Sequence, residues 1–257
     1  MPDLTWAFLD SPQPIAFAHR GAHLEVAENT WLAFVAAAAL GYRYVETDVR
    51  GTADGHVIIC HDARAHRLAG LSGRVSALTL SELRAAPAVS DGVAEVPLLA
   101  DVLAGFPELR FSIDVKDRAS AELVPGILQH ANCYDRVCVS SFSWRRLQRV
   151  RAALPGRVCT GAPVAEVARF LASPRSFAGR AQPAVLQLPM SLHGVPVVTG
   201  RLIRAAHAAG LPVHVWTLND LASIRAALDL GADGIMTDQP VLLKGELTRR
   251  GLWCAPA

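Results

Sequence analysis

The feature that most constrains the fold is an alternation of short apolar segments with longer segments of helical character. Short apolar runs are typical of buried strands, and longer amphipathic stretches are typical of helices. The expected strands cover residues 15–18, 44–49, 57–60, 110–116, 137–140, 157–160, 184–188, 213–217 and 234–236, and the main expected helices cover 29–39, 81–86, 98–104, 121–129, 144–153, 199–209 and 221–230. Strands that alternate with helices in this way form a parallel sheet covered on both faces.

The chain length favours a closed version of such a sheet. With 257 residues and 51% hydrophobic content, the chain can bury a large core, and a single domain of this size is typical of α/β barrels. We therefore predict one (β/α)8 TIM-barrel domain over residues 1–257, with its core at 15–243. Residues 63–98 are too many for a simple loop, which predicts a small insertion after the third strand, over the rim of the barrel. Nine strand candidates for eight places mean that one is wrong or lies outside the barrel.

Composition excludes several classes of partner. The 25 Lys and Arg residues nearly balance the 23 Asp and Glu residues, giving a net charge of +2, so neither nucleic acid nor an anionic membrane surface is expected to bind. The five cysteines show no paired metal spacing and are expected to be reduced thiols, mostly buried. The N-terminus lacks the pattern of a signal peptide, and the longest apolar run, residues 31–40, is too short to span a bilayer. We expect a soluble cytoplasmic protein that acts on a small molecule; the sequence leaves its oligomeric state open.

Ionisable residues end the first three expected strands. In chain order they are His19 with Arg20, Glu46 with Asp48, and His61 with Asp62. Parallel strands deliver the residues at their carboxyl ends to one rim, where barrel enzymes have their active sites. A lone histidine is more often structural, but two histidines facing each other across a barrel mouth can act as base and acid near neutral pH.

The carboxylates in this region predict a metal site. Glu46 and Asp48 are two residues apart, so in a strand their side chains share one face. Two buried carboxylates repel each other unless a cation lies between them. Asp114, at the end of another strand, is a plausible third oxygen ligand, and an all-carboxylate set favours Mg²⁺ or Ca²⁺ over Zn²⁺. The alternative is salt bridges to Arg43 or Arg50, which fits Asp48 less well than Glu46.

Two cations are expected beside this metal site. Lys116 stands two residues after Asp114 and shares its face, and together with Arg20 it could bind one phosphate group. Trp216, at the end of a later strand, offers either a flat apolar wall for the substrate or a plug for the barrel. The other arginines of this region and of the helices, including Arg50, are expected to be solvated. Most other histidines, including His23, are expected to lie at the surface or to have packing roles.

Several short motifs occur along the chain in a fixed order. They are His19-Arg20-Gly21, Glu28-Asn29-Thr30, Glu46-x-Asp48, His61-Asp62, an insertion motif that starts at Ser72-Gly-Arg-Val, Ser141-Phe142, Trp216-Thr-x-Asn219 and Gly234-Ile-Met-Thr-Asp238-x-Pro240. The ordered set, which covers residues 15–243, resembles the glycerophosphodiester phosphodiesterases, which share the (β/α)8 fold of the phosphatidylinositol-specific phospholipases C. The resemblance implies metal-dependent hydrolysis of a glycerophosphodiester to an alcohol and sn-glycerol 3-phosphate.

The resemblance also implies roles for individual residues. His19 and His61 correspond to the acid/base pair, Glu46 and Asp48 to metal ligands, Arg20 and Lys116 to phosphate ligands, and Glu28, Asn29 and Asp62 to supporting residues. The chain departs from the family pattern at two positions. Ala27 replaces the usual Pro before the Glu-Asn-Thr motif, and Asp114 replaces the usual third metal-binding Glu, which bears on the identity and affinity of the metal.

Two other functions are compatible with the same motifs. A phospholipase D-like enzyme acting on lysophospholipids or sphingomyelin would need an apolar lip for acyl chains, and residues 63–96 are not apolar enough to form one. A barrel that binds phosphodiesters without cleaving them is suggested only by the Asp114 substitution. Both histidines and the Glu-x-Asp pair are present, which favours catalysis.

Overall fold

The computed structural model describes residues 6–12, 14–86, 96–180 and 182–254. Its main sheet is a parallel barrel of eight strands in the order β6-β5-β4-β2-β1-β11-β10-β7. The strands are β1 (Ile15–His19), β2 (Tyr44–Gly51), β4 (Arg110–Val115), β5 (Val137–Ser140), β6 (Cys159–Thr160), β7 (Leu186–Pro189), β10 (Val213–Trp216) and β11 (Gly234–Thr237). A parallel bridge between Gly161 and Val185 joins the two ends of this order. The predicted (β/α)8 barrel is therefore confirmed.

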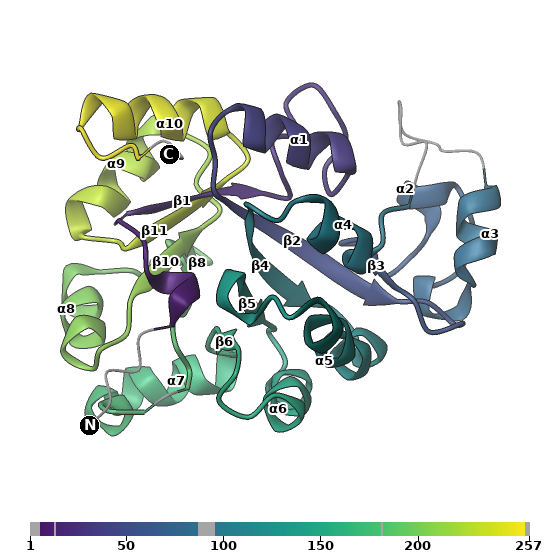
Figure 1. Ribbon diagram of the computed structural model, residues 1–257. Helices are drawn as coiled ribbons and strands as arrows, with labels where there is room; N and C mark the ends of the chain where they lie inside the picture. Colours follow the sequence, from purple (N-terminus) through teal and green to yellow (C-terminus); the bar gives the residue numbers. More distant parts are fainter. Residues whose placement is uncertain (1–5, 13, 87–95, 181, 255–257) are drawn as a thin grey trace.

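Helices surround the barrel (Figure 1). They are α1 (Trp31–Ala39), α4 (Leu99–Gly105), α5 (Arg118–Ala131), α6 (Trp144–Ala153), α7 (Val164–Ala172), α8 (Gly200–Ala208), α9 (Leu221–Leu230) and α10 (Pro240–Arg249). Most begin where the sequence predicts; the Thr30 hydroxyl, for example, accepts a hydrogen bond from the amide of Ala33 and caps α1. Helix α10 was not predicted from the sequence, and neither was α7. Pro163 and the Ser173-Pro174 pair mark the two ends of this helix, although such residues are also typical of loops.

The ninth strand candidate lies outside the barrel. Strand β3 (Val57–Ile59) pairs antiparallel with β2, with Val49 opposite Ile59, after a turn at Asp54 and Gly55. The hairpin extends β2 beyond the barrel wall and returns the chain toward the rim. As a result, His61 reaches the rim from a strand that is not part of the barrel.

The insertion after β3 forms a small unit beside the barrel, shown in blue in Figure 1. It contains α2 (His66–Ala69), a short 3-10 helix (Val75–Ala77) and α3 (Leu80–Ala85). Its own apolar cluster includes Ile58, Val75 and Leu83, all nearly fully buried. The rest of the predicted insertion, residues 87–95, lies outside the described residues.

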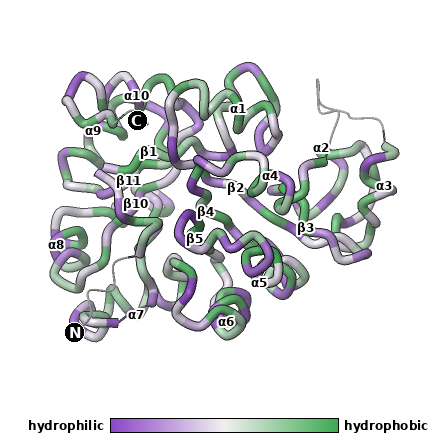
Figure 2. The backbone as a smooth tube through the Cα atoms, in the orientation of Figure 1, coloured by the Kyte–Doolittle hydropathy of each residue, from purple (hydrophilic) through white to green (hydrophobic). Residues whose placement is uncertain are grey.

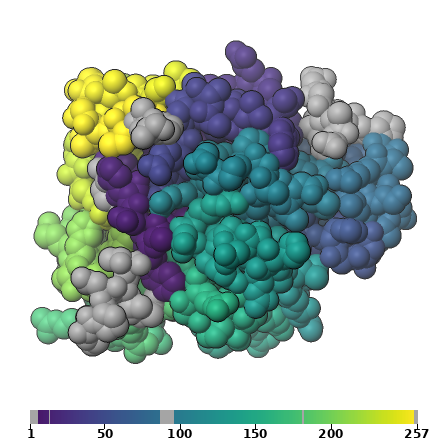
Figure 3. Space-filling model, viewed as in Figure 1, coloured from purple at the N-terminus to yellow at the C-terminus, as the bar shows by residue number. Residues whose placement is uncertain are grey.

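Apolar side chains fill the barrel and the layer between strands and helices. In Figure 2, which colours the backbone by hydropathy, the helices around the barrel carry both hydrophobic (green) and hydrophilic (purple) segments. The end of the barrel opposite the rim is closed by the N-terminal 3-10 helix (Ala7–Leu9), whose residues lie on the face shown in Figure 3. Phe8 packs edge-on against Tyr44 with ring centroids 5.3 Å apart, and the Tyr44 hydroxyl donates a 2.8 Å hydrogen bond to the Phe8 carbonyl. This plug leaves the carboxyl rim as the open end.

Two further predictions concern the chain as a whole. All five cysteines are free, and four of them are buried. Among the described residues, no helix is both long enough and apolar enough to cross a membrane.

Candidate active site

One cavity at the carboxyl rim gathers the predicted functional residues. This active-site cavity has a volume of about 220 Å³ and is lined by His19, Arg20, Glu46, Asp48, His61, Asp114, Lys116 and Trp216, among others.

 Every residue predicted to be catalytic, to bind phosphate or to bind metal lies on the wall of this cavity. The supporting residues Glu28, Asn29 and Asp62 lie in contact with these lining residues.

Lys116 connects two of the carboxylates. Asp48 and Asp114 are register partners on the neighbouring strands β2 and β4. The Lys116 ammonium lies between them, with Nζ 2.7 Å from Asp48 Oδ1 and 2.6 Å from Asp114 Oδ2. Burial opposes the charge on Lys116, but the two carboxylates outweigh it and raise its pKa. In this state Lys116 neutralises carboxylates, and it lies within the cavity where a phosphate would bind.

The three carboxyl groups differ in their electrostatic balance. Burial and the nearby Asp48 charge raise the pKa of Glu46 to about 8, and burial also raises the pKa of Asp114 despite the contact with Lys116. Asp48 is buried too, but Lys116 and Arg20 more than compensate and lower its pKa. Neighbouring cations therefore compensate the negative charge of Asp48, but they do not fully compensate a negative charge on Glu46 or Asp114.

Two carboxylate oxygens at this centre could bind a cation. Glu46 Oε2 and Asp114 Oδ1 are buried and have no hydrogen-bond partner among the described residues. Unpaired buried carboxylate oxygens are costly, and a hard divalent cation would satisfy them. The three carboxylates do not form a compact ligand group here, because the Lys116 ammonium lies between Asp48 and Asp114. The donor set therefore fits Mg²⁺ or Ca²⁺ if Lys116 moves aside.

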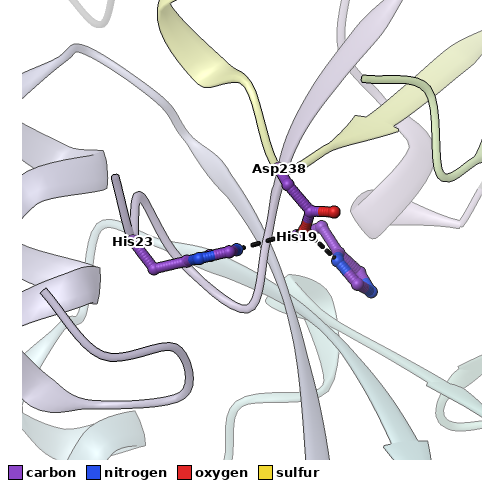
Figure 4. Close-up of side chains that lie close together, drawn as sticks. All are labelled: His19, His23 and Asp238. Atoms are coloured by element: carbon purple, nitrogen blue, oxygen red, sulfur yellow. Dashed lines mark hydrogen bonds and ion pairs between the residues drawn. The ribbon is translucent and has the colours of Figure 1, made fainter. Parts of the chain in front are cut away.

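A second group at the rim contains His19, His23 and Asp238 (Figure 4), whose ligand-type atoms all lie within 4.8 Å of one another. Asp238 Oδ1 lies 2.6 Å from His19 Nδ1 and 3.1 Å from His23 Nε2, so this carboxylate bridges the two rings. The Asn219 amide donates a 2.7 Å hydrogen bond to the other carboxylate oxygen, Oδ2. Asp238 is thereby fixed in orientation and in turn fixes the ring of His19.

His19 is surrounded by groups that favour its charged form. Its Nε2 lies 3.6 Å from Glu46 Oε2. Burial disfavours the imidazolium, but Glu46 and the hydrogen bond to Asp238 outweigh burial and raise the pKa of His19 above its ordinary value. The roles of Asp238 and His23 at the rim were missed from sequence, where His23 was expected at the surface or in packing. The sequence does show that Asp238 directly follows a strand. That Asp238 lies beside His19 depends on the pairing of β11 with β1, which the sequence does not show.

The turn after β1 positions Arg20. Arg20 and Gly21 both have left-handed backbones, with φ of +57° and +84°, which turns the chain sharply at the strand end. Arg20 Nη1 donates to both carboxylate oxygens of Glu28 at 2.9 Å, and its Nε lies 3.1 Å from Asp48 Oδ2. The Asn29 amide donates a 3.0 Å hydrogen bond to the same Asp48 oxygen. Glu28 and Asn29 therefore hold Arg20 and Asp48 in place through direct hydrogen bonds.

His61 is held from two sides. Its Nδ1 lies 2.8 Å from Asp62 Oδ1, and Arg67 donates a 2.8 Å hydrogen bond to Asp62 Oδ2. The Arg50 guanidinium donates to the carbonyl oxygen of His61 at 2.9 and 2.7 Å. The expectation that Arg50 is solvated was wrong, because the β2–β3 hairpin brings this carbonyl oxygen to the guanidinium. Arg67, from the insertion, also pairs with Glu28 and so joins the two halves of the rim.

The opposite wall of the cavity is aromatic. Trp216, the last residue of β10, and Phe142, which follows β5, pack edge to face with ring centroids 5.6 Å apart. Both line the cavity. Trp216 therefore forms a wall of the cavity, and it also packs against the buried cluster inside the barrel that includes Phe17 and Met236.

The fold and the site together define a (β/α)8 barrel enzyme with a charged centre at its carboxyl rim, flanked by two carboxylate-bound histidines. The chain belongs to the glycerophosphoryl diester phosphodiesterase family, whose model matches residues 19–242. Membership in this family makes it a phosphoric diester hydrolase.

Individual relatives agree with this assignment. The chain is 38% identical to "Probable glycerophosphodiester phosphodiesterase 2" of Mycobacterium tuberculosis, covering 97% of this chain and 96% of the relative. It is 28% identical to "Lysophospholipase D GDPD1" of Rattus norvegicus, covering 88% of this chain and 84% of the relative. A solved phosphodiesterase of Oleispira antarctica, in complex with the product sn-glycerol-3-phosphate, matches with a TM-score of 0.74 at 21% identity, covering 92% of this chain and 97% of that one. At 21% identity, the similarity to the Oleispira structure shows a shared fold alone.

Proposed function

We propose that the protein hydrolyses glycerophosphodiesters to an alcohol and sn-glycerol 3-phosphate, with a divalent cation and with His19 and His61 as the acid/base pair. The observation that carries this proposal is the rim cavity in which both histidines border the same cluster of carboxylates and cations. The product bound to the Oleispira neighbour and the name of the mycobacterial relative agree with it.

Each histidine can exchange a proton with the substrate through the same ring atom. Nδ1 of His19 contacts Asp238, and Nδ1 of His61 contacts Asp62. In each ring this leaves Nε2 for the proton transfer, while the carboxylate fixes the orientation of the ring. One histidine takes a proton from the nucleophile, which is water or the neighbouring glycerol hydroxyl, and the other gives a proton to the leaving alcohol.

Arg20 and Lys116 bind the phosphate in this proposal. The Lys116 ammonium can exchange a carboxylate contact for a phosphate oxygen, since Nζ is a compact charge on a flexible stem. Arg20 keeps the contact of its Nη1 with both carboxylate oxygens of Glu28, and its side chain lines the cavity. Their two positive charges offset the charge of the phosphodiester and favour attack at phosphorus.

Glu46, Asp48 and Asp114 would hold the cation, as Mg²⁺ or Ca²⁺. When bound, the cation supplies Lewis-acid polarisation of a phosphoryl oxygen. The same three residues set its affinity, and Asp114 is one methylene shorter than the glutamate expected from the family pattern. A cytoplasmic location and a single domain over residues 1–257 stay predictions.

The test is release of sn-glycerol 3-phosphate from glycerophosphocholine and glycerophosphoethanolamine, first in EDTA and then with Mg²⁺ or Ca²⁺ restored. We expect release only after the metal is restored, and almost none from His19→Ala or His61→Ala under any condition. His130→Ala, which changes an exposed histidine at the end of α5, is the matched control. Near-normal turnover by either active-site variant would rule out the histidine pair, and equal turnover in EDTA would rule out the metal.

A further inference from the structure

An apolar groove opens from the active-site cavity on its aromatic side. Its volume is about 450 Å³, which lies within the range of small-molecule sites, roughly 300–1,000 Å³. Val164, Val167 and Leu171 of α7 form one wall, and Leu192 and Val197 of the segment after β7 form another. We call the space between these two walls the acyl groove.

The acyl groove and the catalytic centre are continuous. Asp114, Ser140, Phe142, Gln187 and Trp216 line both the groove and the active-site cavity. A molecule whose phosphate binds at Lys116 and Arg20 can therefore extend past Phe142 and Trp216 into the groove without leaving the protein surface.

The groove is open to solvent along an apolar border. Val164, Leu171 and Leu192 are 59%, 55% and 57% exposed, respectively. Leu192 belongs to the small antiparallel hairpin of β8 (Ser191–Leu192) and β9 (Val195–Pro196), which also exposes Val195. Large apolar side chains that remain exposed next to an active site indicate a binding surface for an apolar group.

The side of the cavity near His61 carries charged residues. A second pocket of about 230 Å³ shares His61 with the active-site cavity and is lined by Glu28, Asp62 and Arg67, among others. A phosphodiester at the centre thus has a charged side near His61 and an apolar side near Trp216. These two sides suit a substrate with a polar alcohol on one arm and a hydrocarbon chain on the other.

We propose that the acyl groove binds the hydrocarbon chain of a monoacyl glycerophosphodiester whose phosphate lies in the active-site cavity. Water adds to phosphorus, the P–O bond to the polar alcohol breaks, and the alcohol leaves with a proton, so the product is a monoacylglycerol 3-phosphate. The inference rests on the proposed function and names a substrate class for the same site. The name of the rat relative agrees with it. An apolar lip was sought in sequence at residues 63–96, but the apolar surface is formed instead by α7 and by the segment after β7.

The experiment compares glycerophosphocholine with monoacyl glycerophosphocholines of six, eight and ten chain carbons, all below their critical micelle concentrations. Each buried methylene contributes a roughly fourfold gain in affinity. We therefore expect KM to fall by about that factor per added carbon until the groove is filled. The products should be choline and a monoacylglycerol 3-phosphate.

Two variants test the groove itself. Leu171→Gln and Leu192→Gln make its border polar without adding charge, and should remove most of the chain-length dependence while leaving the turnover of glycerophosphocholine unchanged. Leu32→Gln, at a 56% exposed leucine of α1 outside the groove, is the matched control and should behave as the wild type.

The outcomes separate the inference from the proposed function. Turnover of glycerophosphocholine with no effect of chain length, or an unchanged chain-length effect in both groove variants, would overturn the acyl groove and leave the proposed function intact. Release of fatty acid in place of choline would also overturn it. Failure to cleave any of these substrates with metal present would reject the proposed function, and the inference with it.

Discussion

Asp238 Oδ1 lies 2.6 Å from Nδ1 of His19, although the two residues are 219 positions apart in the chain. The contact forms because β1 and β11 are neighbours in the barrel and both end at the same rim. Asp238 contacts His19 but not the substrate in this arrangement, so it is a positioning residue for the proposed acid/base chemistry.

We expect Asp238→Asn to lower kcat by roughly 100-fold, the lower end of the usual contribution of acid/base catalysis. The Asn219 amide donates to Oδ2, so an asparagine at position 238 would turn its own oxygen toward Asn219 and its NH₂ group toward His19. Steady-state kinetics on glycerophosphocholine, with a melting curve to show that the fold is kept, checks this. If kcat stays within twofold of the wild type, Asp238 does not orient His19.

Lys116→Met should destabilise the metal-free protein by about 2–4 kcal/mol, because it leaves Asp48 and Asp114 without their shared cation. Metal should then stabilise the variant more than the wild type, because the cation no longer competes with the ammonium. Urea unfolding in EDTA and with added Mg²⁺ or Ca²⁺ measures both effects. An equal metal response in the two proteins would show that Lys116 and the metal do not share these carboxylates.

Gly21→Ala should cost about 2 kcal/mol or more, because its φ of +84° is strained for alanine and the new Cβ would lie 2.7–2.8 Å from atoms of Ala33. Gly55→Ala is the matched control, with φ of +82° but an open position among the described residues, and should cost only about 1 kcal/mol. Chemical unfolding of both variants gives the comparison. Equal losses would mean that the contact with Ala33 relaxes freely.

His214→Leu should make stability less sensitive to acid. His214 is fully buried inside the barrel, neither ring nitrogen has a hydrogen-bond partner among the described residues, and burial lowers its pKa to about 3. Between pH 6.5 and about 3 the unfolded chain binds a proton that the folded protein does not, so the wild type loses stability as the pH falls through this range. Each pKa unit corresponds to about 1.4 kcal/mol, so the loss amounts to a few kcal/mol.

Unfolding free energies of wild type and His214→Leu from pH 7.5 to 4 test this point. The difference between the two proteins should shift in favour of the variant as the pH falls. Parallel curves would show that His214 is protonated in the folded protein or that the barrel opens to admit water.

The barrel and the centre of the site could be predicted because their signals are local. Glu46 and Asp48 share a strand, and His19 and Lys116 each stand at or next to a strand end, so chain position alone directs them to the rim. The bridge of Asp238 between His19 and His23 could not be predicted, since it depends on which strands become neighbours when the barrel closes. The carbonyl contact of Arg50 depends in the same way on β3 folding back along β2.

The acyl groove was missed for a different reason. Its walls come from α7, which proline and serine residues at its ends made resemble a loop, and from the segment after β7, where exposed Leu192 has no sequence pattern that sets it apart. Apolar residues on separate segments become one surface only after folding, whereas a run of charged residues at a strand end is visible in the sequence.

The pairing of β1 with β11 also has a consequence for synthesis on the ribosome. His19 leaves the exit tunnel 219 positions before Asp238, which directly follows the strand that closes the barrel against β1. A nascent chain therefore carries the charged centre without a closed wall around it until β11 emerges, and activity should arise in one late step instead of growing with chain length.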